Sequence, residues 1–285
     1  MSAATATSEL DAEPDLPPGR YLELPGRGVT FLRDQPGPAN RLPIVLLHGW
    51  TVTADLNFFT VYGGLRDLGR VLAVDLRGHG RGLRPRGPVR LEDMADDLDE
   101  TLRVLAIERA IIVGYSMGGA VAQLMAHRHP ARTAGLVLCS TSCRFRRSSE
   151  GRFVWDRVMP FTAAALSLAP SSLRHSLFER VAMTRTDTAP RWMLEQAARN
   201  DPAALVQSGV EIGRFDASPW LGELPMPIAS VVTTADTTVP TRWQIATARR
   251  AGAQVFTVDA DHHGAVSHPE RFVPALRKAI TAVSR

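Results

Sequence analysis

The chain has 285 residues, of which 45% are hydrophobic, enough for one α/β domain with a large buried core. Its formal net charge is +4, but the arginines are spread along the whole chain and no basic block alternates with aromatic residues, which argues against a nucleic-acid partner. No apolar stretch approaches the ~20 residues that cross a bilayer, and no secretory leader is evident, so we expect no integral membrane segment and a cytoplasmic location.

The N-terminal part predicts a tail followed by the first strands of a sheet. Residues 1–18 are rich in Ala, Thr, Glu and Pro without periodicity, which predicts a disordered tail. Residues 20–24 and 29–33 flank a Pro-Gly turn and predict an antiparallel hairpin. Residues 43–47 form a continuous apolar run, as in a strand that is buried on both faces.

The next elements are expected to alternate between helix and strand. A helix is expected over residues 56–68, and a strand from Val71 leads into Asp75-Leu76-Arg77-Gly78-His79-Gly80. We interpret Asp75 and Arg77 as a structural ion pair or a loop clamp. A second helix is predicted over residues 91–105, because its leucines and Met94 recur on one helical face. Its acidic residues are interpreted as a solvated face: Glu92, Asp93, Asp96, Asp97, Asp99 and Glu100.

The most informative stretch is residues 110–120. An apolar run of strand length ends at Gly114, Ser116 stands between two glycines, and a helix-forming segment follows. The segment around Gly114-x-Ser116-x-Gly118 therefore predicts a strand, a sharp turn and a helix, which is the nucleophile-elbow pattern. Such a turn exposes the serine hydroxyl and directs the first backbone N–H groups of the helix towards one point, where an oxyanion could bind.

Residues 135–140 predict another buried strand, which ends near the two cysteines. Cys139 and Cys143 offer neither a metal-ligand spacing nor a disulfide framework, so we expect reduced, partly buried thiols. Strands that alternate with helices at this spacing predict a mostly parallel, doubly wound α/β sheet with its chemistry at the carboxyl ends of the strands.

From residue 143 to 221 no strand-like run appears, and the helical periodicity predicts an inserted helical cap. Its scattered large apolar side chains favour a small apolar substrate. The sheet is expected to resume at Pro227, in a run that leads to Asp236, and a last strand is expected over residues 254–258. The chain thus divides into a tail (1–18), a first core part (19–142), the cap (143–221) and a second core part (222–285).

Four motifs at matching topological positions resemble the α/β-hydrolase superfamily. They are His48-Gly49-Trp50, Gly114 to Gly119, Asp236-Thr237-Thr238-Val239-Pro240, and His262 seven residues before Pro269. The chain order Ser, Asp, His is also that of this superfamily. The resemblance implies a Ser116–His262–Asp236 triad, with the backbone N–H groups of Trp50 and Met117 as the oxyanion hole and His48 as a structural residue.

The chain departs from the pattern of this superfamily at three positions. Arg81 replaces the usual Ser after Asp-x-Arg-Gly-x-Gly, Thr233 replaces the usual Gly of the acid loop, and Asp261 replaces the usual Gly before the catalytic His. The last departure keeps the neighbouring His263 open as an alternative base.

The resemblance implies a cofactor-free and metal-free serine hydrolase, in first place a carboxylic-ester hydrolase that forms an acyl-enzyme. Haloperoxidases and perhydrolases without cofactor, C–C bond hydrolases and some acyltransferases use the same triad, and a small-ligand receptor on the same fold is a further alternative. A dehalogenase or epoxide hydrolase would need Asp in place of Ser116.

Overall fold

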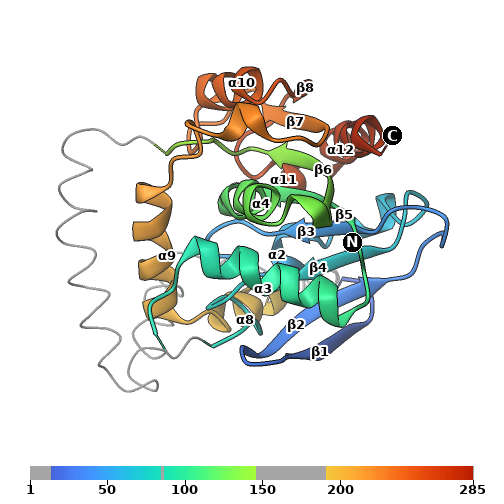
Figure 1. The fold of residues 1–285 in the computed structure, drawn as a ribbon, viewed down its shortest axis with the longest axis vertical. Coiled ribbons are helices and arrows are strands. Elements are labelled where there is room, and N and C mark those ends of the chain that lie inside the picture. The colour runs from blue at the N-terminus through green and yellow to red at the C-terminus, as the bar shows by residue number, and fades with distance from the viewer. Residues whose placement is uncertain (1–13, 85–86, 146–190, 285) are drawn as a thin grey trace, which may run out of the picture.

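The computed structural model of the protein describes residues 14–84, 87–145 and 191–284 (Figure 1). An eight-stranded sheet with the order β1-β2-β4-β3-β5-β6-β7-β8 forms its centre. β1 and β2 run antiparallel to their neighbours, and the strands from β4 to β8 are parallel, which confirms the predicted doubly wound sheet. The strands are β1 (Gly19–Leu24), β2 (Gly28–Gln35), β3 (Ile44–Leu47), β4 (Val71–Val74), β5 (Ala110–Tyr115), β6 (Thr133–Cys139), β7 (Ile228–Thr233) and β8 (Gln254–Val258).

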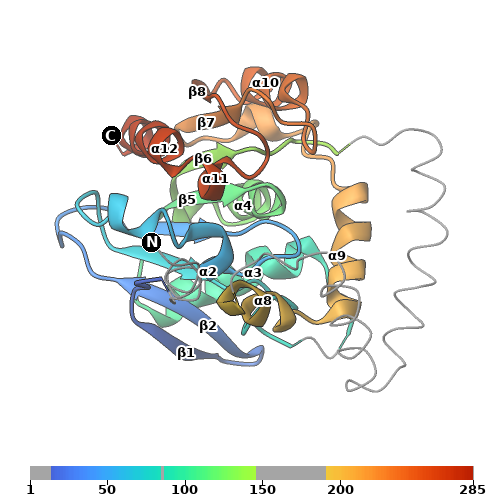
Figure 2. The ribbon, with the colours of Figure 1, turned by 180° about the vertical axis from the view of Figure 1, so that it is seen from behind.

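Helices cover both faces of this sheet. α3 and α4 lie on the face turned to the viewer in Figure 1, whereas α2, α11 and α12 lie on the face seen in Figure 2. The helices of the described residues are α2 (Ala54–Phe58), α3 (Leu91–Val104), α4 (Met117–Arg128), α8 (Arg191–Ala198), α9 (Pro202–Arg214), α10 (Thr241–Arg250), α11 (Gly264–Ser267) and α12 (Pro269–Val283). None of these helices is long and apolar enough to span a membrane.

The continuous apolar strands follow from this two-sided cover. In β5, Ile112 packs into the cluster under α3 and α4, whereas Ile111 and Val113 pack into the cluster under α12. Because successive side chains of a strand point to opposite faces, a strand between two helical layers needs apolar residues at every position. The same reason explains the fully buried β3 and β4.

The helix expected over residues 56–68 is wrong in its length. The structure has the short helix α2, then a turn, and then a 3₁₀ helix at Tyr62–Gly64. The adjacent glycines Gly63 and Gly64 weaken a helix, since each costs about 1 kcal/mol relative to Ala. Phe58 and Leu65 are nevertheless buried, so the apolar positions of this segment still serve the core.

The loop after β4 contains charged groups that pair differently from expectation. Asp75 and Arg77 do not pair with each other, but Asp75 acts as a loop clamp, since its carboxylate accepts from the backbone N–H groups of Ala54 at 2.9 Å and Arg81 at 2.8 Å. Arg77 instead makes two hydrogen bonds, of 2.6 and 2.7 Å, to Asp97, whose side chain is buried. The interpretation of Asp97 as part of a solvated face is therefore wrong, because a cation on a neighbouring loop compensates its charge.

Arg81, which replaces the expected Ser, lies in a buried ion network. Its guanidinium contacts Asp55 at 2.6 Å and Asp75 at 3.3 Å, and its Cζ lies 3.5 Å from the ring centroid of Phe31. Arg33 contacts Asp55 at 2.7 Å on the other side. Burial raises the pKa of Asp55, but its hydrogen bonds and charge interactions with the two arginines outweigh burial and leave the pKa lowered.

Parts of the expected organisation lie outside the described residues. This holds for residues 1–13 of the tail and for residues 146–190 of the cap. Of the tail, Leu16 packs against the core and the carbonyl of Pro17 accepts a 2.9 Å hydrogen bond from Arg33. Cys139 and Cys143 are both buried and unoxidised, and burial raises the pKa of the Cys139 thiol.

Candidate active site

Ser116 is located in a strained turn between β5 and α4. Its backbone has φ 53° and ψ −116°, a left-handed conformation that costs a non-glycine residue roughly 1–3 kcal/mol. Two hydrogen bonds hold this turn: Ser116 N–H donates to the carbonyl of Cys139 at 3.0 Å, and the Thr141 hydroxyl donates to the carbonyl of Ser116 at 2.7 Å. The turn leaves Ser116 partly accessible at the carboxyl edge of the sheet, as a nucleophile must be.

The two glycines of the elbow are required by close backbone contacts. A Cβ on Gly114 would lie 2.3 Å from the carbonyl oxygen of Gly118, and a Cβ on Gly118 would lie 2.1 Å from that of Leu47. Contacts under 3.0 Å force a displacement. The glycines thus let the first turn of α4 pack directly against the carboxyl ends of β5 and β3.

A hydrogen-bonded chain joins Ser116 to two residues far away in the sequence. Oγ of Ser116 lies 3.0 Å from Nε2 of His262, and Nδ1 of His262 lies 2.8 Å from Oδ2 of Asp236. Asp236 follows β7 and His262 follows β8, and both strands end at the same edge of the sheet as β5. The structure therefore brings together the three side chains that the sequence pattern predicts.

The carboxylate of Asp236 is fully buried and accepts hydrogen bonds from several groups. Oδ1 accepts from the backbone N–H groups of Thr238 and Val239 at 2.9 and 2.8 Å. Oδ2 accepts from the Thr233 hydroxyl and from Nε2 of Gln244, both at 2.9 Å. Burial raises the pKa of Asp236, but the hydrogen bond and charge of His262, with the other donors, outweigh burial, so the pKa is lowered and the group stays ionised.

The structure separates His262 from its neighbour His263. The carbonyl of His262 accepts a 2.6 Å hydrogen bond from the Tyr115 hydroxyl, and this bond ties the loop to the residue before Ser116. His263 is exposed, and its backbone N–H donates to the Asp261 carboxylate at 2.9 Å. Asp261 therefore closes a turn that directs only His262 towards Ser116.

The loop after β3 passes beside the elbow. A Cβ on Gly49 would lie 3.5 Å from the Cβ of Ser116, and Gly49 N–H donates to Oδ1 of Asn57 at 2.8 Å. We refer to residues 48–53 as the oxyanion loop, since the sequence pattern places one oxyanion donor, Trp50 N–H, in it. The second expected donor, Met117, is the first residue of α4, where backbone N–H groups have no partner within the helix.

His48 braces this loop and does not contact the Ser116 chain. Nε2 of His48 accepts from Leu76 N–H at 2.9 Å, so its proton is on Nδ1, which lies 2.7 Å from the carbonyl of Gly49. Burial lowers the pKa of His48 to about 4, and the ring is neutral at neutral pH. These contacts agree with the structural role expected for His48.

Sequence reasoning missed the side chains that support the three central residues. They are Asn57, Tyr115, Thr141, Thr233 and Gln244. Only Thr233 left a signal, as a departure from the pattern of the superfamily. The others carry none, because their partners are brought close by the fold.

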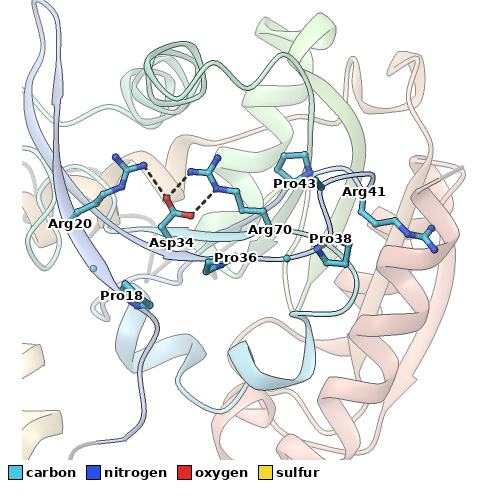
Figure 3. Close-up of a pocket in the computed structure, with 11 residues that line it drawn as sticks. Pro18, Arg20, Asp34, Pro36, Pro38, Arg41, Pro43 and Arg70 are labelled. Atoms are coloured by element: carbon cyan, nitrogen blue, oxygen red, sulfur yellow. Dashed lines mark hydrogen bonds and ion pairs between the residues drawn. The ribbon is translucent and has the colours of Figure 1, made fainter.

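The surface also has a hollow of about 650 Å³ at the opposite end of the sheet, by the amino ends of β3 and β4 (Figure 3). Arg20 and Arg70 both bind Asp34 there, at 2.9 and 2.7 Å, so each guanidinium already has an anionic partner, which the two share. Among the residues that the structure describes, no three His, Cys, Asp or Glu side chains gather as a metal site.

Comparisons with known proteins show which sequences and structures the chain is similar to. A sequence model described as "Alpha/beta hydrolase family" matches residues 44–275. A putative non-heme haloperoxidase of Mycobacterium phage D29 is 30% identical over 236 residues, which cover 80% of this chain and 84% of the phage protein. A pimeloyl-[acyl-carrier protein] methyl ester esterase of Edwardsiella ictaluri is 29% identical, with 84% and 93% covered. The crystal structure of a hydrolase from Pseudomonas aeruginosa PA01 superposes with a TM-score of 0.75 at 25% identity, with 93% and 98% covered.

Proposed function

The chain belongs to the alpha/beta hydrolase family, and on this basis we propose that it hydrolyses carboxylic esters of small apolar acyl groups through an acyl-enzyme on Ser116. One observation carries the proposal: the strained, accessible Ser116 is hydrogen-bonded to His262, which in turn is hydrogen-bonded to a buried carboxylate. A serine hydroxyl becomes a nucleophile when an adjacent base accepts its proton, and the carboxylate stabilises the imidazolium that forms.

The proposed reaction has two halves. Oγ of Ser116 attacks the ester carbonyl while Nε2 of His262 takes the hydroxyl proton, and the backbone N–H groups of Trp50 and Met117 bind the oxyanion. His262 then gives this proton to the departing alkoxide, which leaves as an alcohol. In the second half a water loses a proton to His262 and attacks the acyl-enzyme, and Oγ of Ser116 departs with that proton to restore the free serine.

The preference for an apolar substrate rests on the cap that the sequence predicts over residues 143–221. In its described part, Trp192 of α8 is buried and packs edge-on against Phe59, with ring centroids 5.0 Å apart. We propose that the described part of the cap, whose Leu205 carbonyl accepts a 2.8 Å hydrogen bond from Nε1 of Trp50, covers the acyl side of the site. The name of the Edwardsiella relative, a methyl ester esterase, is consistent with an ester substrate.

The test is the hydrolysis of p-nitrophenyl esters of graded acyl length by the wild-type protein and by Ser116→Ala. We expect turnover that depends on Ser116, and covalent labelling of Ser116 by a fluorophosphonate. The preferred acyl length would measure the pocket. If the wild-type protein neither turns over any ester nor reacts with the fluorophosphonate, the proposal is wrong and a ligand-binding role becomes the better explanation.

The phage relative favours a second candidate, since it is named a putative non-heme haloperoxidase. Hydrogen peroxide in place of water would attack the same acyl-enzyme and release a peracid. The peracid would then oxidise bromide to hypobromite and be reduced to the carboxylic acid. Bromination of monochlorodimedone by the protein with acetate, bromide and peroxide tests this activity, and Ser116→Ala should abolish it.

A further inference from the structure

Asn200 connects three separate segments of the molecule. It lies between α8 and α9 and is fully buried. Its Nδ2 donates to the carbonyl of Thr51 and to the carbonyl of Ala197, both at 3.0 Å, and its Oδ1 accepts from Gly80 N–H at 2.8 Å. Since an amide side chain has two N–H groups, both of its donors are used, and its orientation is determined by its partners.

The contact with Thr51 lies where the oxyanion loop needs support. Thr51 has φ 67°, a left-handed conformation that is strained for a β-branched residue and persists only where the surroundings hold it. It directly follows Trp50, whose backbone N–H is the proposed oxyanion donor. A hydrogen bond to the Thr51 carbonyl therefore restrains the backbone immediately after that donor.

A second hydrogen bond joins the oxyanion loop to the segment that contains α8 and α9. Nε1 of Trp50 donates to the carbonyl of Leu205 in α9 at 2.8 Å. The segment around Asn200 is itself docked on the loop after β4, because Asp201 N–H donates to the carbonyl of Gly78 at 3.1 Å. The oxyanion loop is thus held by Asn57 from within the core and by Asn200 from the α8–α9 segment.

We propose that Asn200 is a positioning residue that fixes the strained backbone at Thr51, so that the α8–α9 segment determines where Trp50 N–H points. The catalytic consequence rests on the proposed function, whereas the restraint of the loop does not. A displacement of about 1 Å at a reacting group can cost about 100-fold in rate, so loss of this restraint should act on the chemical step.

The chain offers two test variants and a matched control. Asn200→Asp has the same shape and keeps the acceptor for Gly80 N–H, but it loses both donors. Asn200→Leu removes the polar contacts without placing a charge in the interior. Arg84→Gln is the control, because Arg84 donates to the carbonyls of Gly80 and Arg199 and thus joins the loop after β4 to the α8–α9 segment without involving the Thr51 carbonyl.

Hydrogen exchange and kinetics together decide the proposal. We expect both Asn200 variants to exchange the Gly49 amide of the oxyanion loop, which donates to Asn57, at least about tenfold faster, and to lower kcat for an ester about 10- to 100-fold with KM little changed. Arg84→Gln should change neither quantity comparably. Melting temperatures and the exchange of the β5 amides show whether each variant keeps its global fold. If Asn200→Asp does not fold, Asn200→Leu is compared with the wild-type protein instead.

Two results would overturn the inference. One is unchanged exchange of the Gly49 amide in both Asn200 variants, and the other is an equal effect of Arg84→Gln, which would make Asn200 one of several general docking contacts. If the wild-type protein turns over no ester, the proposed function fails. The exchange measurement still decides whether Asn200 restrains the loop.

Discussion

The hydroxyl of Thr233 donates a 2.9 Å hydrogen bond to Oδ2 of Asp236, the same oxygen that lies 2.8 Å from Nδ1 of His262. Glycine is usual at this position in the superfamily, so the structure explains a departure that the sequence alone left without a reason. Thr233 is fully buried, and the hydroxyl receives a hydrogen bond from Gln244 at 2.9 Å. The side chain thus belongs to the network that keeps the carboxylate ionised.

Thr233→Val should weaken this network, since valine has the same shape without the donor. We expect kcat to fall about tenfold, because a lost hydrogen bond to a charged group is worth roughly 1.5–3 kcal/mol. Thr233→Ser keeps the hydroxyl and should restore most of the activity. Steady-state kinetics of the three proteins are the measurement, and equal activity of Thr233→Val and wild type would contradict the role of Thr233.

The same substitution should change the stability towards acid. The pKa of Asp236 is lowered in the folded protein, so its contribution to stability is present above the unfolded pKa and is lost as the pH falls through the folded pKa. Removal of a donor raises the folded pKa and makes this contribution smaller. Acid unfolding followed by circular dichroism should therefore have its midpoint at higher pH in Thr233→Val, and a midpoint at lower pH would refute the argument.

The adjacent histidines should differ strongly in their effect on activity. His262→Ala removes the proposed base and should lower kcat/KM about 10²- to 10⁴-fold. His263→Ala removes an exposed ring and should have little effect. Kinetics with one ester substrate measure both variants, and the reverse order of effects would transfer the base to His263.

Gly118→Ala should disturb the elbow, whereas Gly63→Ala should not. The new methyl at position 118 would lie 2.1 Å from the carbonyl oxygen of Leu47, while a methyl at position 63 meets no atom within 4 Å. Overpacking of this kind costs about 1–3 kcal/mol, and here it would also push α4 away from the oxyanion loop. Urea unfolding and kcat are the measurements. A Gly118→Ala protein as stable and active as Gly63→Ala would show that the turn relaxes freely.

Asp55→Asn should be strongly destabilising, because it removes the buried counter-charge of Arg33 and leaves Arg81 with Asp75 alone. The loss of one partner of a buried pair costs about 3–5 kcal/mol. The control is Asp67→Asn, which breaks an ion pair with Arg277 at the surface and should change the urea midpoint least. Similar midpoints for the two variants would mean that water reaches Arg33 and Arg81.

The sequence by itself determined the features that are encoded over short distances. The apolar strands, the amphipathic α3 and the elbow at Ser116 each depend on residues within about one element of each other, so their patterns can be recognised locally. The doubly wound sheet then follows from the alternation of these elements. The short α2 is an exception, because two glycines divide a segment whose apolar spacing still favours a helix.

Only the tertiary structure decided which polar groups meet. Asn200 and Thr51 are 149 positions apart, Tyr115 and His262 147, and Arg77 and Asp97 20. No periodicity links such pairs, since buried polar groups are satisfied by whichever donors and acceptors the packing brings near them. For the same reason only the structure distinguished His262 from His263. The two residues are adjacent in the chain, but the ring of His262 reaches Ser116, whereas the side chain of His263 is exposed.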